Sequence, residues 1–249
     1  MAGRDSSYEA AAAGARQFVT TRWTMVLAAG HRSSPDSRKA LATLCETYWF
    51  PLYAYVRRRG HAAHDAQDLT QEFFARLLEK EKLAGLTRDK GKFRSFLLTA
   101  MNHFLVDEWK RAAAQKRGAN QIISLDAAAA ETRYRLEPAD PLTAEKVFEK
   151  QWALTLLDVV FQRLQKEYGA AGKGALFAEL QFSLMGERSA VPYAELATRL
   201  EMSESAVKVA VHRLRQRYRE VLRAEVAETV AGPEEVEEEL RDLLKAVAG

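Results

Sequence analysis

The sequence has little cysteine and no long apolar run. Cys45 is the only cysteine in 249 residues. This excludes an internal disulfide and a cysteine-rich zinc site, and it is typical of a reducing compartment. No apolar stretch approaches the roughly 20 residues that a membrane span needs, and the start MAGRDSSYEA lacks the hydrophobic core of a signal peptide. We therefore expect a soluble, cytoplasmic protein without membrane contact.

Excess charge and catalytic motifs are also scarce. The net charge is +3, so any nucleic-acid surface has to come from local clustering of cations. The chain contains no H-E-x-x-H, no P-loop and no nucleophile elbow. His61, His64, Asp65 and Asp68 imitate metal ligands only loosely, because no third histidine lies near them. We expect neither an enzyme nor a bound metal or cofactor.

What the chain does have is helical periodicity. Apolar residues recur at three- and four-residue steps in most segments, and no alternating strand pattern is seen. An aperiodic region with an Ala run and P-A-D-P separates two periodic parts. The expected fold class is all-α, with two helical domains joined by a linker. The expected divisions are a first domain at 16–118, a linker at 119–143, a second domain at 144–226 and an acidic amphipathic helix at 227–249. Helices are expected at 18–29, 37–59, 64–78, 93–111, 144–168 and 176–184.

The stretch 192–221 predicts a short helix, a tight turn and a long basic helix, which is the layout of a helix-turn-helix DNA reader. Ser203 is a good N-cap for the second helix. The alternative is an amphipathic surface helix with solvated charges; the short partner helix and the capped turn favour DNA. One side of the long helix is apolar through Val207, Val211, Leu214, Tyr218 and Val221, and another is cationic through Lys208, His212, Arg215 and Arg219.

Two stretches of the first domain carry further patterns. In 64–78, Asp65, Asp68 and Glu72 form an acidic stripe beside Gln71. Since acid repels DNA, a functional stripe would face a basic protein surface, whereas composition alone favours a solvated face near a helix N-terminus.

The second pattern lies in 93–111, where aromatic and cationic side chains together suit stacking on single-stranded bases and neutralising phosphates. Trp109 could equally be a core residue, which is the commoner fate of a lone tryptophan. The polar side of this helix offers Arg94, Asn102, His103, Lys110 and Arg111.

Three motifs together resemble one family. The first is D-A-Q-D-L-T-Q-E-F-F at 65–74, preceded by Y-W-F-P-L-Y at 48–53. The second is F-R-S-F-L at 93–97, continued by Asn102, Leu105, Asp107, Lys110 and Arg111. The third is Y-A-E-L-A at 193–197 with M-S-E-S-A-V-K at 202–208 and H-R at 212–213. Their order and spacing resemble bacterial RNA polymerase sigma factors of the small extracytoplasmic-function type, in a divergent subgroup, over residues 35–118 and 145–226.

The resemblance implies roles for particular residues. Those expected to contact the polymerase clamp are Asp65, Asp68, Gln71 and Glu72. Those expected at the minus-ten promoter element are Lys92, Arg94, Asn102, Trp109, Lys110 and Arg111, with Asn102 lining the pocket of a flipped base. Those expected at the minus-thirty-five duplex are Ser205, Lys208, His212, Arg213 and Arg217.

The resemblance also implies partners, namely core RNA polymerase and promoter DNA, and it leaves an anti-sigma factor open. The alternative function is a helix-turn-helix regulator that binds DNA without polymerase. Many relatives carry arginine where this chain has Ala210 and a small polar residue where it has Val209, so a promoter preference cannot be transferred. The acidic tail either folds back on the basic helix or serves a partner, and its charge suggests the hypothesis that it holds the second domain closed.

Overall fold

The computed structural model describes residues 35–79, 92–114, 131, 134, 142–184 and 191–248. Every regular element among these residues is helical, which confirms the all-α prediction. The helix expected at 18–29 and most of the expected linker lie outside the described residues. The elements are α3 (Pro35–Arg58), α4 (Ala63–Glu79), α5 (Phe93–Ala114), α7 (Ala144–Ala170), α8 (Gly174–Leu180), η3 (Gln181–Leu184), α9 (Tyr193–Arg199), α10 (Glu204–Ala227), η4 (Pro233–Glu235) and α11 (Val236–Ala248).

The helix starts follow local sequence signals. Ser203 has an extended backbone conformation, and its side chain accepts a hydrogen bond from the amide of Ala206, so the predicted N-cap of α10 is confirmed. Thr143 caps α7 in the same way through the amide of Lys146. Pro233 stands in the first turn of η4, where its missing amide proton costs nothing. These caps fix where the two longest helices of the second half begin.

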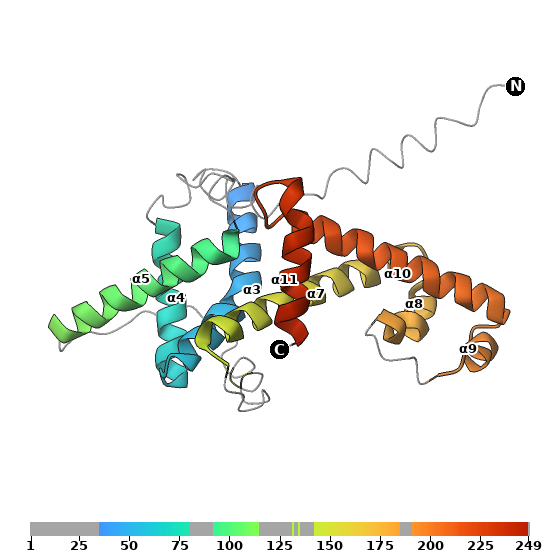
Figure 1. Cartoon of the computed structure of the whole chain (residues 1–249), viewed down its shortest axis with the longest axis horizontal. Helices are drawn as coiled ribbons and strands as arrows, with labels where there is room; N and C mark the ends of the chain where they lie inside the picture. The colour runs from blue at the N-terminus through green and yellow to red at the C-terminus, as the bar shows by residue number, and fades with distance from the viewer. Residues whose placement is uncertain are drawn as a thin grey trace, which may run out of the picture.

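The helices form an elongated body with α7 along its middle (Figure 1). Helices α3, α4 and α5 gather at one end, and α8, α9 and the start of α10 gather at the other. Helix α7 contacts α3 in the first group and both α8 and α10 in the second. Helix α11 crosses between the two groups and contacts α7 and α10. The two predicted domains therefore meet along α7 and α11.

The core is one connected apolar cluster that runs through both groups. Phe148, Trp152, Val160 and Leu164 of α7 are all fully buried in this cluster. A buried aromatic or aliphatic side chain contributes about 1.5–3 kcal/mol relative to an exposed one. A shared core of this kind resists separation of the two groups. The division of the chain at residues 143 and 144 stays a prediction.

The acidic tail folds back onto the body, so one of the two alternatives for it is observed. Val236 and Leu243 of α11 are buried in the common core, while Leu244 is 61% exposed. The first turn of α11 is acidic, which suits the positive end of the helix dipole. Among the described residues no helix is long and apolar enough to cross a membrane.

Candidate nucleic-acid interface

The turn between α9 and α10 sets the direction of the basic helix. The amide of Met202 donates to the carbonyl of Ala197 at 2.9 Å, and the amide of Glu201 donates to the carbonyl of Thr198 at 3.3 Å. The backbone of Glu201 has a φ of 53°, the left-handed conformation that commonly ends an α-helix. This pair of bonds closes α9 and turns the chain sharply into the Ser203 cap. The helix-turn-helix layout predicted for 192–221 is therefore present.

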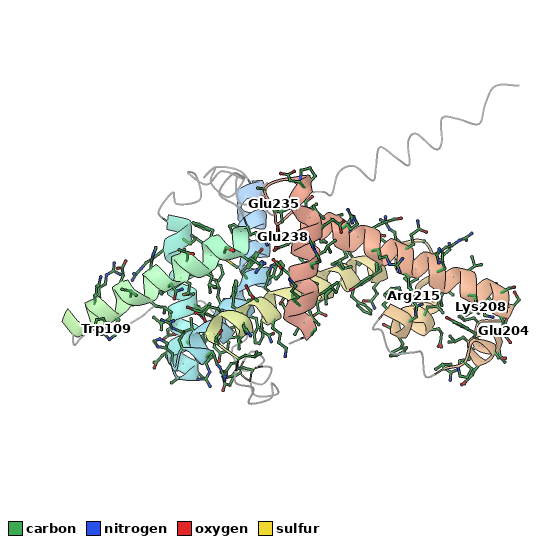
Figure 2. All side chains as sticks on the ribbon, in the orientation of Figure 1. Trp109, Glu204, Lys208, Arg215, Glu235 and Glu238 are labelled. Atoms are coloured by element: carbon green, nitrogen blue, oxygen red, sulfur yellow. The ribbon has the colours of Figure 1, made fainter. Side chains whose placement is uncertain are left out.

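The outer face of α10 holds most of the residues that the resemblance assigns to the minus-thirty-five duplex. Ser205, Lys208, His212 and Arg213 are all exposed, and Lys208 lies at one end of the molecule in Figure 2. The Lys208 ammonium lies 5.8 Å from the ring centroid of Tyr193, a cation–π distance that leaves it beside the turn.

Arg217 differs from these residues because it is held internally. Its Nε and one terminal nitrogen donate to the two carboxylate oxygens of Glu167 on α7, at 2.9 and 3.1 Å. Its other terminal nitrogen donates to Glu220 at 3.1 Å. Burial by itself raises the pKa of the Glu167 carboxyl. The hydrogen bonds from Arg217 and the charges of the nearby arginines outweigh burial and lower this pKa below its usual value. The side chain of Arg217 is still 43% exposed.

A groove of about 770 Å³ runs beside this face, between α10 and the end of α7. Val209 and Ala210, the two positions at which the sequence departs from the pattern of the family that it resembles, line this groove with Met202 and Arg213. Val209 is 48% exposed. The departures therefore lie on the accessible surface, beside the cations, rather than in the core.

Helix α4 presents the predicted acidic residues unevenly. Asp65 is exposed, and Asp68 pairs with Nδ1 of His64 at 3.1 Å. Glu72 accepts from Arg76 at 2.6 Å, and Arg76 also pairs with Glu108 of α5. The acidic residues are thus partly neutralised by the same protein, which leaves Asp65 as the exposed acid at the start of the stripe.

Gln71, the fourth residue assigned to the clamp, faces inward in part. Its Nε2 atom is buried, and none of the described residues accepts a hydrogen bond from it. Its assigned role stays a prediction, and the geometry distinguishes it from the more accessible Asp65.

The far half of α5 is the second exposed surface. Trp109 is 73% exposed and lies at the end of the molecule opposite Lys208 (Figure 2), so the alternative of a core tryptophan is wrong. Lys110 and Arg111 follow it and are exposed, although Arg111 donates to Glu108 at 2.7 Å. This is an accessible aromatic ring beside two cations, the arrangement that suits stacked single-stranded bases.

Asn102 lies further inside on α5. Its side-chain oxygen accepts a hydrogen bond of 2.5 Å from the hydroxyl of Tyr55, a fully buried residue of α3. Burial raises the pKa of Tyr55, so this hydroxyl keeps its proton and remains a donor at neutral pH. The bond fixes the orientation of the Asn102 amide, whose predicted contact with a base stays a prediction.

The ion pairs at the start of α5 are contacts that the sequence did not predict. Lys92 and Arg94, both assigned to strand phosphates, are paired with carboxylates of α11. Lys92 Nζ lies 2.8 Å from Glu239 and 2.7 Å from Asp242. Arg94 makes a two-pronged contact with Glu239, at 2.7 Å from Nε and 3.0 Å from a terminal nitrogen. In this arrangement the side chain of Arg94 is buried and that of Lys92 is 20% exposed.

The pKa values of these groups follow from the pairing. Burial by itself lowers the pKa of Arg94, but the hydrogen bonds and charge of Glu239 outweigh burial and raise it. The pKa of Lys92 is raised for the same reason, with Asp242 as the first bonding partner. The hydrogen bond from Lys92 is the main cause that lowers the pKa of Asp242. All three groups are charged at neutral pH.

The sequence held one signal for this cluster. The run 234–239 of the tail contains five glutamates, of which Glu239 is the last. If any member of such a run is buried, it requires a cation nearby. No group of three or more metal-ligating side chains occurs within the described ranges.

Comparison with known proteins gives one match. Residues 45–115 match the family model described as Sigma-70 region 2. The match covers the end of α3, all of α4 and all of α5, and so includes the acidic residues of α4 and both ends of α5. The chain matches no curated protein and no solved structure.

Proposed function

Because this chain belongs to the sigma-70 family of sigma factors, we propose that it binds core RNA polymerase through α4 and directs the enzyme to promoters through α5 and α10. Sigma factors take part in promoter recognition with RNA polymerase. The finer proposal is that α5 reads the minus-ten element and α10 reads the minus-thirty-five element. The small two-domain type fits the two groups of helices.

The observation that carries this proposal is the placement of two unlike surfaces at opposite ends of the body. One end exposes Trp109 beside Lys110 and Arg111, and the other exposes Lys208, His212 and Arg213 on a capped helix (Figure 2). An exposed ring beside cations suits unstacked bases, whereas a cationic helix after a tight turn suits the major groove of a duplex. A protein that handles both melted and paired DNA needs both surfaces.

The acidic side of α4 supports the polymerase contact. A groove of about 570 Å³ lies between α4 and α5 beside the end of α3, and its lining is more acidic than basic. The acids are Asp65, Asp68 and Glu108, and the other lining residues are Arg59, His61, Leu69, Leu105, Val106 and Trp109. A carboxylate beside DNA-binding cations weakens DNA binding unless a basic protein surface covers it. The groove therefore fits a basic partner element that lies next to the minus-ten surface. The chemistry of RNA synthesis belongs to the polymerase in this proposal.

The test is co-purification of the whole chain with core RNA polymerase, followed by run-off transcription. Asp65→Lys is expected to lower polymerase binding at least tenfold, because the exposed charge is reversed at the proposed contact. Asp158→Lys makes the same charge change at an exposed position of α7 and is expected to bind as the unaltered chain does.

Failure of the unaltered chain to bind core polymerase would contradict the proposal. Sequence-specific DNA binding without polymerase would then favour the alternative, a helix-turn-helix regulator. Equal loss in both variants would mean that net charge, rather than α4, governs the contact.

A further inference from the structure

Three carboxylates of α11 surround the two cations that begin α5. Glu239 bonds both Lys92 and Arg94, and Asp242 lies 2.7 Å from Lys92 and 3.4 Å from Arg94. Glu238 lies 3.5 Å from Lys92 and stands where α11 begins, near the middle of the body (Figure 2). The contact joins two positive side chains to three negative side chains of α11.

The centre of this cluster is shielded from water. The side chain of Glu239 is 0% exposed and that of Arg94 is 8% exposed. The guanidinium carbon of Arg94 lies 4.6 Å from the ring centroid of Trp152 on α7, and its remaining terminal nitrogen donates to Glu149 at 3.1 Å. Buried ions are stable only when they are paired and hydrogen-bonded. Arg94 and Glu239 therefore depend on one another.

Helix α11 fastens the two groups of helices at the same place. Glu237 of α11 pairs with Arg223 of α10. In the segment before α11, the carbonyl of Thr229 accepts a backbone hydrogen bond of 3.4 Å from the amide of Phe93. The start of α5, the end of α10 and α11 thus meet at one junction. Opening α11 would expose the cations of α5 and free the two groups at once.

The length of α11 makes such opening feasible. The helix has 13 residues, and an isolated helix shorter than about 12–15 residues is marginal in water. Its stability comes from Val236, Leu243 and the ion pairs rather than from its own backbone. An element of this kind exchanges between docked and undocked states more easily than α7 does.

A carboxylate and a phosphate compete for the same N–H donors. Lys92 and Arg94 lie within the matched residues 45–115 and begin the helix that carries the exposed minus-ten surface. While Glu239 and Asp242 hold them, a DNA phosphate cannot bond to them. We propose that α11 is a clasp that substitutes for the DNA backbone at Lys92 and Arg94 and keeps the free protein closed, and that the promoter strand displaces it.

This inference rests on the proposed function only in assigning Lys92 and Arg94 to DNA. The clasp predicts that removing the carboxylates of α11 strengthens DNA binding by the free protein. A negative charge lost anywhere also strengthens it slightly, so the test needs a control with an equal change in net charge.

The experiment measures binding of a fluorescein-labelled single-stranded oligonucleotide to the whole chain by anisotropy. Glu239→Gln with Asp242→Asn is expected to raise the affinity about 5- to 150-fold, the usual range for coupling between two sites. The control, Glu234→Gln with Asp158→Asn, removes two exposed acids that are not among the ion-pair partners of Lys92 and Arg94. Adding Lys92→Gln to the first variant is expected to remove much of the gain and to lower the salt slope by about one unit.

Hydrogen exchange on the same variants separates opening from unfolding. In the clasp variant the amides of α11 are expected to exchange faster while those of α7 stay protected. If α7 also loses protection, the single variant Asp242→Asn is measured instead, because it leaves the two-pronged Arg94–Glu239 contact in place. Its control is Asp158→Asn, and a smaller gain in DNA affinity above this control is expected.

An affinity equal to that of the control overturns the clasp, whichever variant is used. Because the oligonucleotide assay contains no polymerase, it is independent of the polymerase test above. A gain in DNA binding without polymerase binding keeps the clasp and removes the proposed function. If the chain binds polymerase but the clasp variant shows no gain in DNA affinity, the proposed function stands and the clasp is overturned.

Discussion

The two surfaces that are assigned to DNA differ in how their cations are held. On α10, Lys208, His212 and Arg213 are exposed, and the bonds that hold Arg217 come from α7 and from α10 itself. At the start of α5, Lys92 and Arg94 are enclosed by acids of α11. The same side-chain chemistry is therefore available to a duplex at one place and occupied at the other. Under the proposed function, exposure rather than residue type decides which of the two surfaces DNA can reach in this structure.

This difference predicts opposite consequences for a lost arginine. An arginine that is enclosed contributes to stability, because its partner stays buried when it is gone. An arginine that is exposed contributes to binding, because water replaces its ligand in the free protein. The predictions below test each side of this contrast.

The largest effect is expected for Arg94→Met. The change leaves Glu239 as a buried charge without its main partner, which costs about 3–5 kcal/mol in the free energy of unfolding. Urea unfolding followed by circular dichroism measures it. Arg219→Met, at an exposed position of α10, is the control and is expected to stay within about 0.5 kcal/mol. A loss below about 1 kcal/mol for Arg94→Met would mean that Glu239 finds another cation or water, and that Arg94 does not hold α11.

A smaller effect, on binding alone, is expected for Arg213→Ala. The exposed guanidinium has no partner among the described residues, so its loss leaves the unfolding free energy within about 0.5 kcal/mol. Binding of a promoter duplex is expected to weaken by about 1–3 kcal/mol, the value of a side-chain contact with a base edge. Titration of a labelled duplex with polymerase and the chain measures this. Lys166→Ala removes the same charge from an exposed position of α7; an equal weakening there would show that only net charge matters.

The contrast also shows what a sequence reveals. The Ser203 cap and the apolar side of α10 at Val207 and Val211 follow from capping and spacing preferences among residues close together in the chain, and the structure confirms them. Those signals are local. The family likewise follows from motifs, which the match over residues 45–115 supports.

The partner of a charged residue is not a local property. Arg94 and Glu239 are 145 residues apart in the chain, and periodicity tells which side of α11 is apolar but not which helix that side meets. The exposure of Trp109 is a similar case, since composition favours a core tryptophan. Whether a cation is free or clasped thus depends on tertiary contacts that no local pattern specifies.

The smallest expected effect is on the pH dependence of stability, and it compares Asp242 of α11 with Glu167 of α7. The hydrogen bond from Lys92 is the main cause that lowers the pKa of Asp242. Burial raises the pKa of Glu167, but the bonds from Arg217 and the charge of Arg163 outweigh burial and lower it. A carboxyl whose pKa is lower in the folded chain stabilises that chain above the pKa of the unfolded state, about 4, and this contribution is lost as pH falls through the folded value.

The stability difference between the unaltered chain and Asp242→Asn is therefore expected to shrink as pH falls below about 4. The difference for Glu167→Gln is expected to shrink over the same range. Urea unfolding at several pH values between neutrality and strong acid measures both. A difference for Asp242→Asn that does not change with pH would mean that Asp242 is not ionised against Lys92. If both differences shrink together, acid weakens the junction at α11 and the contact between α7 and α10 alike, so protonation is not a selective way to open the clasp.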